Sequence, residues 1–238
     1  MARFRSLKPK VQAILDNADQ HVALEALGRF TPREIIGPLF SLLLAPSERI
    51  RWRAVTALGA TVAGMARVRM EDARVVMRRF MWHMNEESGN IGWGIPEAMA
   101  ESMARHEGLA REFHKVLGSY VQCPECALGD DNFLDHPPLR LGVYWGLGRL
   151  AEERPGCVAP VVGDLLRSLQ SEGSPMARGL ICRALGRLGA ASAVEYLKPL
   201  AQSPDELELY RGWSIEQTTL GALASEALAT LEHTKEQA

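Results

Sequence analysis

Two cysteines separated by two residues are the first pattern in this chain that points to chemistry. Cys123 and Cys126 have the spacing that supplies two corners of a tetrahedral zinc site, and a complete site needs two further ligands. The pair also fits a redox dithiol, although the βαβ pattern of thioredoxin-like dithiols does not surround it. Because no further ligand stands at a diagnostic spacing, we expect an inert loop and no bound cofactor. The candidate further ligands are His136, Asp135, His114 and Cys157.

A second polar segment carries adjacent carboxylates at Glu86 and Glu87, directly after Asn85. The glycines that follow allow a close approach of the backbone or a tight connection. Paired carboxylates serve acid–base catalysis or bind cations, but no partner base or nucleophile can be identified here. We therefore interpret the segment as a turn between helices with capping interactions, and we predict no catalytic residue.

The elements that must position such residues repeat along the chain. A short phrase built around Ala-Leu-Gly recurs at separations of 31 to 48 residues. In each copy the residue four before the central one is apolar, and the residue one before it is small. This is the period of a helix, and recurrence at tens of residues is typical of a solenoid. The central residues, called anchors below, are Leu27, Leu58, Met99, Leu147, Leu185 and Leu228.

Further helices with the same period are expected between the helices that carry the anchors. We predict a capping helix near residues 7–17, no strand, and a single HEAT-like repeat domain over residues 1–238. Longer loops are expected near 122–138 and 203–216. The intervening helices are predicted at 33–44, 71–84, 108–121, 156–170 and 191–202.

The alternating helices and the phrase R-x-x-A-x-x-A-L-G-R-L resemble HEAT-like repeats, in particular the short variety of the phycobilisome lyases. The resemblance covers nearly the whole chain and implies an all-α fold, a right-handed α–α superhelix (α-solenoid) of about six helical pairs. It says little about activity, because such arrays serve many functions. A looser resemblance to uncharacterised bacterial HEAT-like proteins rests on NEESGNIGWGIPEAM at 85–99 and DNFLDHPPLRLGVYWGLGRL at 131–150, and it implies no activity.

The second helix of each pair lines the concave surface of a HEAT-like stack, as the resemblance implies. Helix positions on the side opposite the anchors carry three tryptophans, and a tryptophan outside the core stripe is a candidate binding anchor. The alternative is that these rings pack against adjacent repeats. The predicted partner-binding residues are Trp52, Trp93, Trp145, Glu97, Glu101, Arg149, Arg183 and Arg187.

Composition narrows the class of protein. Hydrophobic residues make up 47% of the chain and charged residues 24%, as in ordinary soluble domains. No run of about 18 apolar residues predicts a membrane span, and no signal-peptide pattern follows the basic start, so we expect a cytoplasmic protein. Residues 1–80 carry 14 Lys and Arg against 7 Asp and Glu, whereas residues 81–238 carry 13 against 22. Solvated helix faces explain this asymmetry, and steering of a partner is the alternative.

The favoured function is a non-catalytic scaffold that binds a protein partner or peptide segment on its concave face, with no prediction of oligomeric state. An enzyme is the main alternative, because two HEAT-like groups are enzymes. Deoxyhypusine hydroxylases need several His-Glu dipeptides for a di-iron site, and His106-Glu107 is the single one here. Alkylpurine DNA glycosylases use an aromatic, basic concave face, which the three tryptophans echo. Glu97 and Glu101 would repel phosphate, so nucleic acid is not the expected partner.

A third class, a lyase-type maturation factor or chaperone, is suggested by the repeat subtype alone. It shares with the scaffold the expectation of a protein partner rather than a nucleic acid or a membrane.

Overall fold

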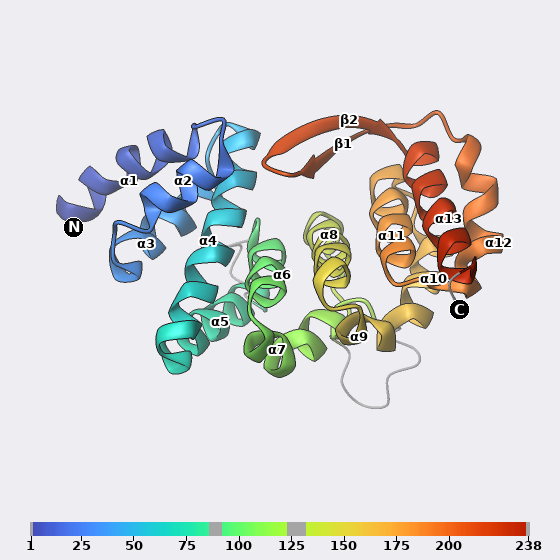
Figure 1. Ribbon diagram of the computed structural model, residues 1–238, viewed down its shortest axis with the longest axis horizontal. Coiled ribbons are helices and arrows are strands. Elements are labelled where there is room, and N and C mark those ends of the chain that lie inside the picture. Colours follow the sequence, from blue (N-terminus) through green and yellow to red (C-terminus); the bar gives the residue numbers. More distant parts are fainter. Residues whose placement is uncertain (1, 86–91, 123–131, 237–238) are drawn as a thin grey trace. The chain divides into compact units, whose positions relative to one another are not determined.

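The computed structural model describes residues 2–85, 92–122 and 132–236 and folds most of them into helices (Figure 1). The described chain forms two compact units. Unit 1 comprises residues 1–110 and 210–215, and unit 2 comprises residues 111–209 and 216–238. None of the helices among the described residues is long and apolar enough to cross a lipid bilayer.

The first six helices belong to unit 1, and their sequences explain where they begin. Ser47 caps α4 by accepting a hydrogen bond from the backbone N–H of Ile50 at 3.4 Å, and Glu48 in the first turn suits the positive end of the helix dipole. The bounds are α1 (Ala2–Leu15), α2 (Gln20–Leu27), α3 (Pro32–Leu42), α4 (Glu48–Val68), α5 (Met70–Met84) and α6 (Ile95–Arg105).

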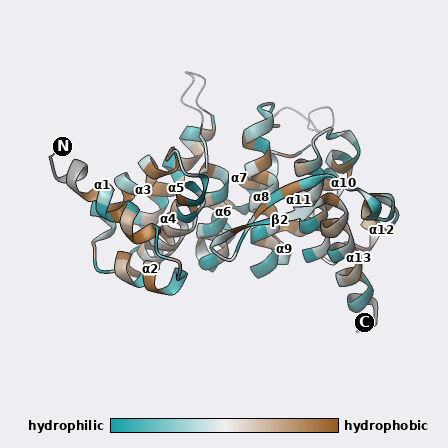
Figure 2. Ribbon diagram, turned by 90° about the horizontal axis from the view of Figure 1, so that it is seen from above, coloured by the Kyte–Doolittle hydropathy of each residue, from teal (hydrophilic) through white to brown (hydrophobic). Residues whose placement is uncertain are grey.

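The remaining elements begin with α7, whose first residues belong to unit 1 and whose later residues belong to unit 2. They are α7 (Glu107–Ser119), α8 (Pro137–Glu153), α9 (Pro155–Val158), η1 (Ala159–Val161), α10 (Val162–Ser171), α11 (Pro175–Arg187), η2 (Ala191–Ala193), α12 (Val194–Leu197), η3 (Lys198–Gln202), β1 (Glu206–Arg211), β2 (Ser214–Thr219) and α13 (Leu220–Glu236). The ribbons of both units alternate hydrophobic and hydrophilic segments, as amphipathic helices do (Figure 2).

The anchor stripe predicted from the sequence forms the core. The anchors from Leu27 to Leu185 are at most 2% exposed, and Leu228 is half-buried. The residues four positions before the anchors are buried in every copy: Ala23, Ala54, Ile95, Val143, Ile181 and Ala224. Within unit 1, α4 packs against α3, α5 and α6; within unit 2, α11 packs against α8 and α13.

Two predicted helices are interrupted where a proline stands inside them. Residues 156–170 form α9, η1 and α10, with Pro160 in η1, and residues 191–202 form η2, α12 and η3, with Pro199 in η3. Proline lacks the backbone N–H and crowds the preceding turn, so the α-helical pattern breaks into short pieces.

The prediction of no strand, with a long loop near 203–216, is wrong. β1 and β2 form an antiparallel hairpin across a two-residue turn at Gly212 and Trp213. Both turn residues have positive φ, 56° and 79°, as in the tight turns that suit a hairpin's twist. Buried Leu207 and Leu209 alternate with exposed Glu206 and Glu208, which is a period-2 pattern too short to stand out among the helices.

Close packing of α4 on α6 generates a stability prediction. A Cβ at Gly59 would lie 2.5 Å from Glu101 Cγ, whereas a Cβ at Gly64, on the same helix, would meet nothing within 4 Å. We expect Gly59→Ala to lower the free energy of unfolding by roughly 1–3 kcal/mol through overpacking. The matched control Gly64→Ala should raise it by about 0.5–1 kcal/mol, because alanine favours a helix interior. Urea unfolding followed by circular dichroism measures both, and equal effects would contradict the packing.

Candidate functional site

The end of α3, the start of α4 and the start of α6 surround a pocket of about 430 Å³ in unit 1. Its walls are apolar, and its polar groups are few. The lining residues are Leu43, Leu44, Ala45, Glu48, Arg51, Trp52, Val55, Trp93, Gly94 and Glu97.

A tight connection before α6 places two pocket residues. Gly94 is the N-cap of α6 and has φ 71°, which a residue with a side chain rarely adopts. A Cβ there would also come within 3.1 Å of Leu43 Cδ2 and 3.3 Å of Val55 Cγ2. This conformation leaves Trp93 on one side of the cap, with 40% of its surface exposed, and Glu97 in the first turn on the other.

Glu97 supplies an acidic group with unusual surroundings. Its Oε2 atom is buried and has no hydrogen-bond partner among the residues that the structure describes. Burial raises the pKa of this carboxyl to about 7, and a hydrogen bond from its own backbone N–H opposes the rise. The side chain is therefore close to half-ionised near neutral pH.

Trp52 is held in place by strand β1 of the hairpin. Its ring stacks on that of Tyr210, with centroids 5.0 Å apart and an angle of 9° between the planes. The Tyr210 hydroxyl and Thr56 Oγ1 lie 2.9 Å apart in a buried hydrogen bond. Burial raises the pKa of Tyr210 to about 12, so this hydroxyl stays protonated.

Arg53, the next residue on α4, binds the hairpin turn through hydrogen bonds to backbone carbonyls. Its Nε donates to the Trp213 carbonyl at 3.1 Å, and its Nη1 donates to the carbonyls of Leu15 and Asn17 at 2.9 and 2.8 Å. The guanidinium also lies 5.1 Å from the centroid of the Trp213 ring, whose Nε1 donates to the Asn17 carbonyl at 2.9 Å. Burial lowers the pKa of Arg53.

Two charged side chains stand at the rim of the pocket. Arg51 Nη1 donates to the carbonyls of Ala45 and Pro46 at 3.1 and 3.4 Å, which holds it against the connection between α3 and α4. Glu48, in the first turn of α4, is exposed and carries the opposite charge. Their charges offset each other, so Glu97 decides the electrostatic character of the interior.

The structure brings together some of the predicted binding residues and buries others. Trp52, Trp93 and Glu97 line one pocket. Glu101 is 3% exposed, because α6 packs closely on α4 at Gly59, and its carboxylate accepts a 2.6 Å hydrogen bond from Arg105. The prediction that Glu101 lies on an open surface is therefore wrong.

Unit 2 contains the other predicted residues, grouped around Glu152. Trp145 is 4% exposed and Arg183 is 7% exposed, with the guanidinium carbon of Arg183 6.0 Å from the ring centroid. Arg183 Nη2, Arg187 Nε and Arg149 Nη1 approach Glu152 at 2.5, 3.6 and 3.5 Å. Packing of α8 against α11 covers these flanking positions, so Trp145 and Arg183 are not surface anchors, contrary to the prediction.

The candidates for metal or acid–base chemistry lie mostly beyond the described residues. Cys123, Cys126, Glu86 and Glu87 are outside them, and the zinc hypothesis stays a prediction. His136 caps α8, where its Nδ1 accepts from the Leu139 N–H at 3.4 Å. Over residues 2–85, 92–122 and 132–236, no cluster of three His, Cys, Asp or Glu has metal-binding geometry.

Sequence reasoning did not identify Tyr210, Trp213 or Arg53 as contributors to this site. The signal for the first two was the alternating pattern before Gly212. Nothing in the sequence distinguishes Arg53 from the other arginines of α4, because its role depends on carbonyl groups from distant segments.

No family model matches the chain. Among curated proteins, an uncharacterised protein from Archaeoglobus fulgidus is 27% identical over 188 residues, which cover 79% of this chain and 92% of that protein. This similarity brings no known activity with it.

The raised pKa of Glu97 predicts a pH-dependent stability difference. Because the folded chain binds this proton more tightly than the unfolded chain does, the stabilisation is present below the unfolded value near 4.5 and is lost as pH rises through about 7. Glu97→Gln should therefore exceed the wild type's free energy of unfolding by less than about 1 kcal/mol near pH 5 and by roughly 2–4 kcal/mol at pH 8.

Urea unfolding at both pH values tests this, with the exposed Glu25→Gln as the matched control. All titratable groups other than Glu97 and Glu25 are shared by the three proteins, so their contributions cancel in the differences. A difference for Glu97→Gln that does not change between pH 5 and pH 8 would show that the carboxyl is ionised throughout.

Proposed function

We propose that the chain is a non-catalytic, cytoplasmic scaffold of HEAT-like repeats, coiled as a right-handed α–α superhelix, that binds a segment of a protein partner. The recurring anchors and the packing of anchor-bearing helices on one another within each unit support the repeat architecture. The pocket between α3, α4 and α6 is the proposed binding site.

An exposed indole beside an apolar pocket is the observation that carries this proposal. Trp93 is 40% exposed where it lines a cavity of about 430 Å³, and Trp52 lines the same cavity with its ring fixed by Tyr210. Large aromatic side chains in such positions dominate the energetics of protein interfaces. A pocket of this size accepts one side chain of a bound segment more readily than a folded surface.

Carboxylates argue against a nucleic acid in the same pocket. Glu48 and Glu97 line it with Arg51 as the accompanying cation, so the pocket lacks the excess positive charge that binds a phosphate backbone. A role as a lyase-type chaperone would use the same site, because it also requires recognition of a protein segment.

Selection from a random dodecapeptide phage library against the immobilised full-length chain tests the proposal. Peptides that survive should bind the wild type in solution and lose about 30-fold in affinity with Trp93→Ala, which corresponds to about 2 kcal/mol for an anchor residue. Fluorescence anisotropy of labelled peptides measures the change.

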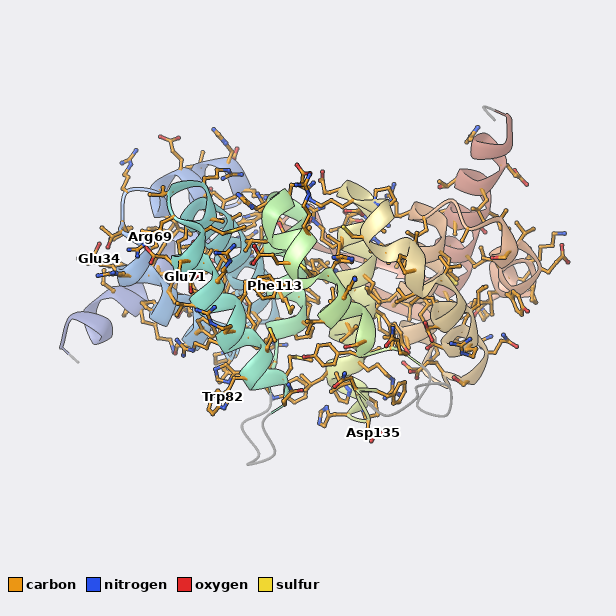
Figure 3. The ribbon with its side chains drawn as sticks, turned by 90° about the horizontal axis from the view of Figure 1, so that it is seen from below. Glu34, Arg69, Glu71, Trp82, Phe113 and Asp135 are labelled. Carbon is orange, nitrogen blue, oxygen red and sulfur yellow. The ribbon has the colours of Figure 1, made fainter. Side chains whose placement is uncertain are left out.

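Trp82→Ala is the matched control. Trp82 lies near the C-terminal end of α5 (Figure 3) and is 59% exposed. It is not among the residues that line the pocket, so its removal should change peptide affinity by less than about twofold. Trp93→Ala should also leave the fold intact, whereas the core truncation Leu147→Ala should cost about 2–5 kcal/mol of stability. Selected peptides whose affinity does not change with Trp93→Ala, or tight salt-sensitive binding of DNA or RNA, would contradict the proposal.

A further inference from the structure

One of the residues that line the pocket between α3, α4 and α6 carries an unsatisfied acceptor, and two aromatic side chains line the same pocket. Glu97 Oε2 is buried without a partner among the described residues, and Trp52 and Trp93 line the same cavity. A buried carboxylate oxygen that lacks a donor is costly, and a ligand that brings a donor removes the cost.

We propose that this pocket binds an alkylammonium group, supplied by a lysine side chain of the partner segment. This inference rests on the proposed function and adds the chemistry of the ligand. The ammonium donates to Glu97 Oε2, and the indoles provide electron-rich surfaces that attract a cation. The alkyl stem lies along the apolar walls, as the stem of a lysine does when its charged end is fixed.

The number of open acceptor atoms favours ammonium over guanidinium. A guanidinium pairs best with a carboxylate through two parallel hydrogen bonds, which need both oxygens. Oε2 is the Glu97 oxygen that is buried without a partner among the described residues, so the carboxylate presents a single unsatisfied acceptor. A compact ammonium matches a single acceptor.

Two features at the rim of the pocket repel a cation, and in each the positive charge is offset by a neighbouring acidic residue or hydrogen-bonded carbonyl. The N-terminal ends of α4 and α6 carry partial positive charge, but each has an acidic residue in its first turn, Glu48 and Glu97. Arg51 is bonded to the carbonyls of Ala45 and Pro46 and stands beside Glu48 at the rim.

Binding of the cation is coupled to release of a proton. The free protein holds the Glu97 carboxyl partly protonated at neutral pH, and the ammonium binds the carboxylate, so the displaced proton passes to solvent. Among the described residues, the other charged groups that line the pocket are Glu48 and Arg51 of α4. Glu101 is paired with Arg105 further along α6, the His83 ring of α5 lies against Phe40, and the Tyr210 ring of the hairpin stacks on Trp52.

The experiment titrates the full-length chain with n-butylammonium chloride and follows the indole N–H signals in two-dimensional NMR spectra, assigned with Trp93→Phe. At pH 8 we expect the Trp93 signal to shift with saturation, and the affinity to fall about tenfold at pH 6, where about one tenth of the carboxyls are ionised. Glu97→Gln should weaken binding about tenfold or more at pH 8 and abolish the pH dependence. Glu25→Gln, an exposed acid outside the pocket, should behave as the wild type.

Matched probes identify the recognised group. n-Butylguanidinium and n-butanol should bind at least about tenfold more weakly than n-butylammonium, and n-butyrate should not compete. Equal binding of the alcohol or the guanidinium, preference for butyrate, or binding that Glu97→Gln leaves unchanged would overturn the inference.

The outcomes separate this inference from the proposed function. Selected peptides that depend on Trp93 but not on Glu97 or on a lysine would leave the scaffold standing and refute the ammonium site. Binding of n-butylammonium that depends on Glu97, with no peptide that depends on Trp93, would establish the ammonium site and refute the protein partner.

Discussion

The hydrogen bonds of the Arg53 guanidinium are the interactions on which the arrangement of unit 1 depends. Its guanidinium satisfies the carbonyl of Leu15 at the end of α1, that of Asn17 in the following turn, and that of Trp213 in the hairpin turn. Carbonyls at the end of a helix have no partner within the helix, and buried ones must find a donor elsewhere. One buried side chain therefore fixes two segments that are almost 200 residues apart in sequence.

The hydrogen bonds of Arg53 also hold the hairpin that supports Trp52 in the pocket. Trp213 has φ 79°, a conformation that costs on the order of 1–3 kcal/mol for such a residue and persists only where its surroundings enforce it. The hydrogen bond from Trp213 Nε1 and the contact with Arg53 enforce it, and strand β1 of the same hairpin carries Tyr210, which stacks on Trp52. An indole held in this way loses little further entropy when a ligand arrives, which favours binding.

Local patterns in the sequence predicted the helices and their buried stripe, because helix periodicity depends on neighbours within a few residues. They failed where the outcome depends on contacts between distant segments. The hairpin was missed because two alternating leucines are too short a pattern to distinguish a strand from a loop. Pro160 interrupts a predicted helix, although the apolar period continues past it. Trp93 and Trp145 were both predicted on the side opposite their anchors, yet Trp93 precedes α6 and is 40% exposed, whereas packing of α8 on α11 buries Trp145. Of the candidate pocket, the sequence therefore predicted Trp52, Trp93 and Glu97 but not the hairpin that supports it.

The position of Glu97 is difficult to explain by stability alone. An apolar residue of similar size would bury the same surface without an unpaired oxygen, and a cost of roughly 2–4 kcal/mol above pH 7 is a large part of the 5–15 kcal/mol that stabilises a typical domain. The neighbouring Gly94 is also conformationally demanding, since its φ of 71° and its contacts exclude a side chain. Departures from the rules of local stability tend to gather at binding sites, where they are maintained by the interaction they serve. In unit 1 both departures, Gly94 and Glu97, follow Trp93 within four residues and line the same pocket.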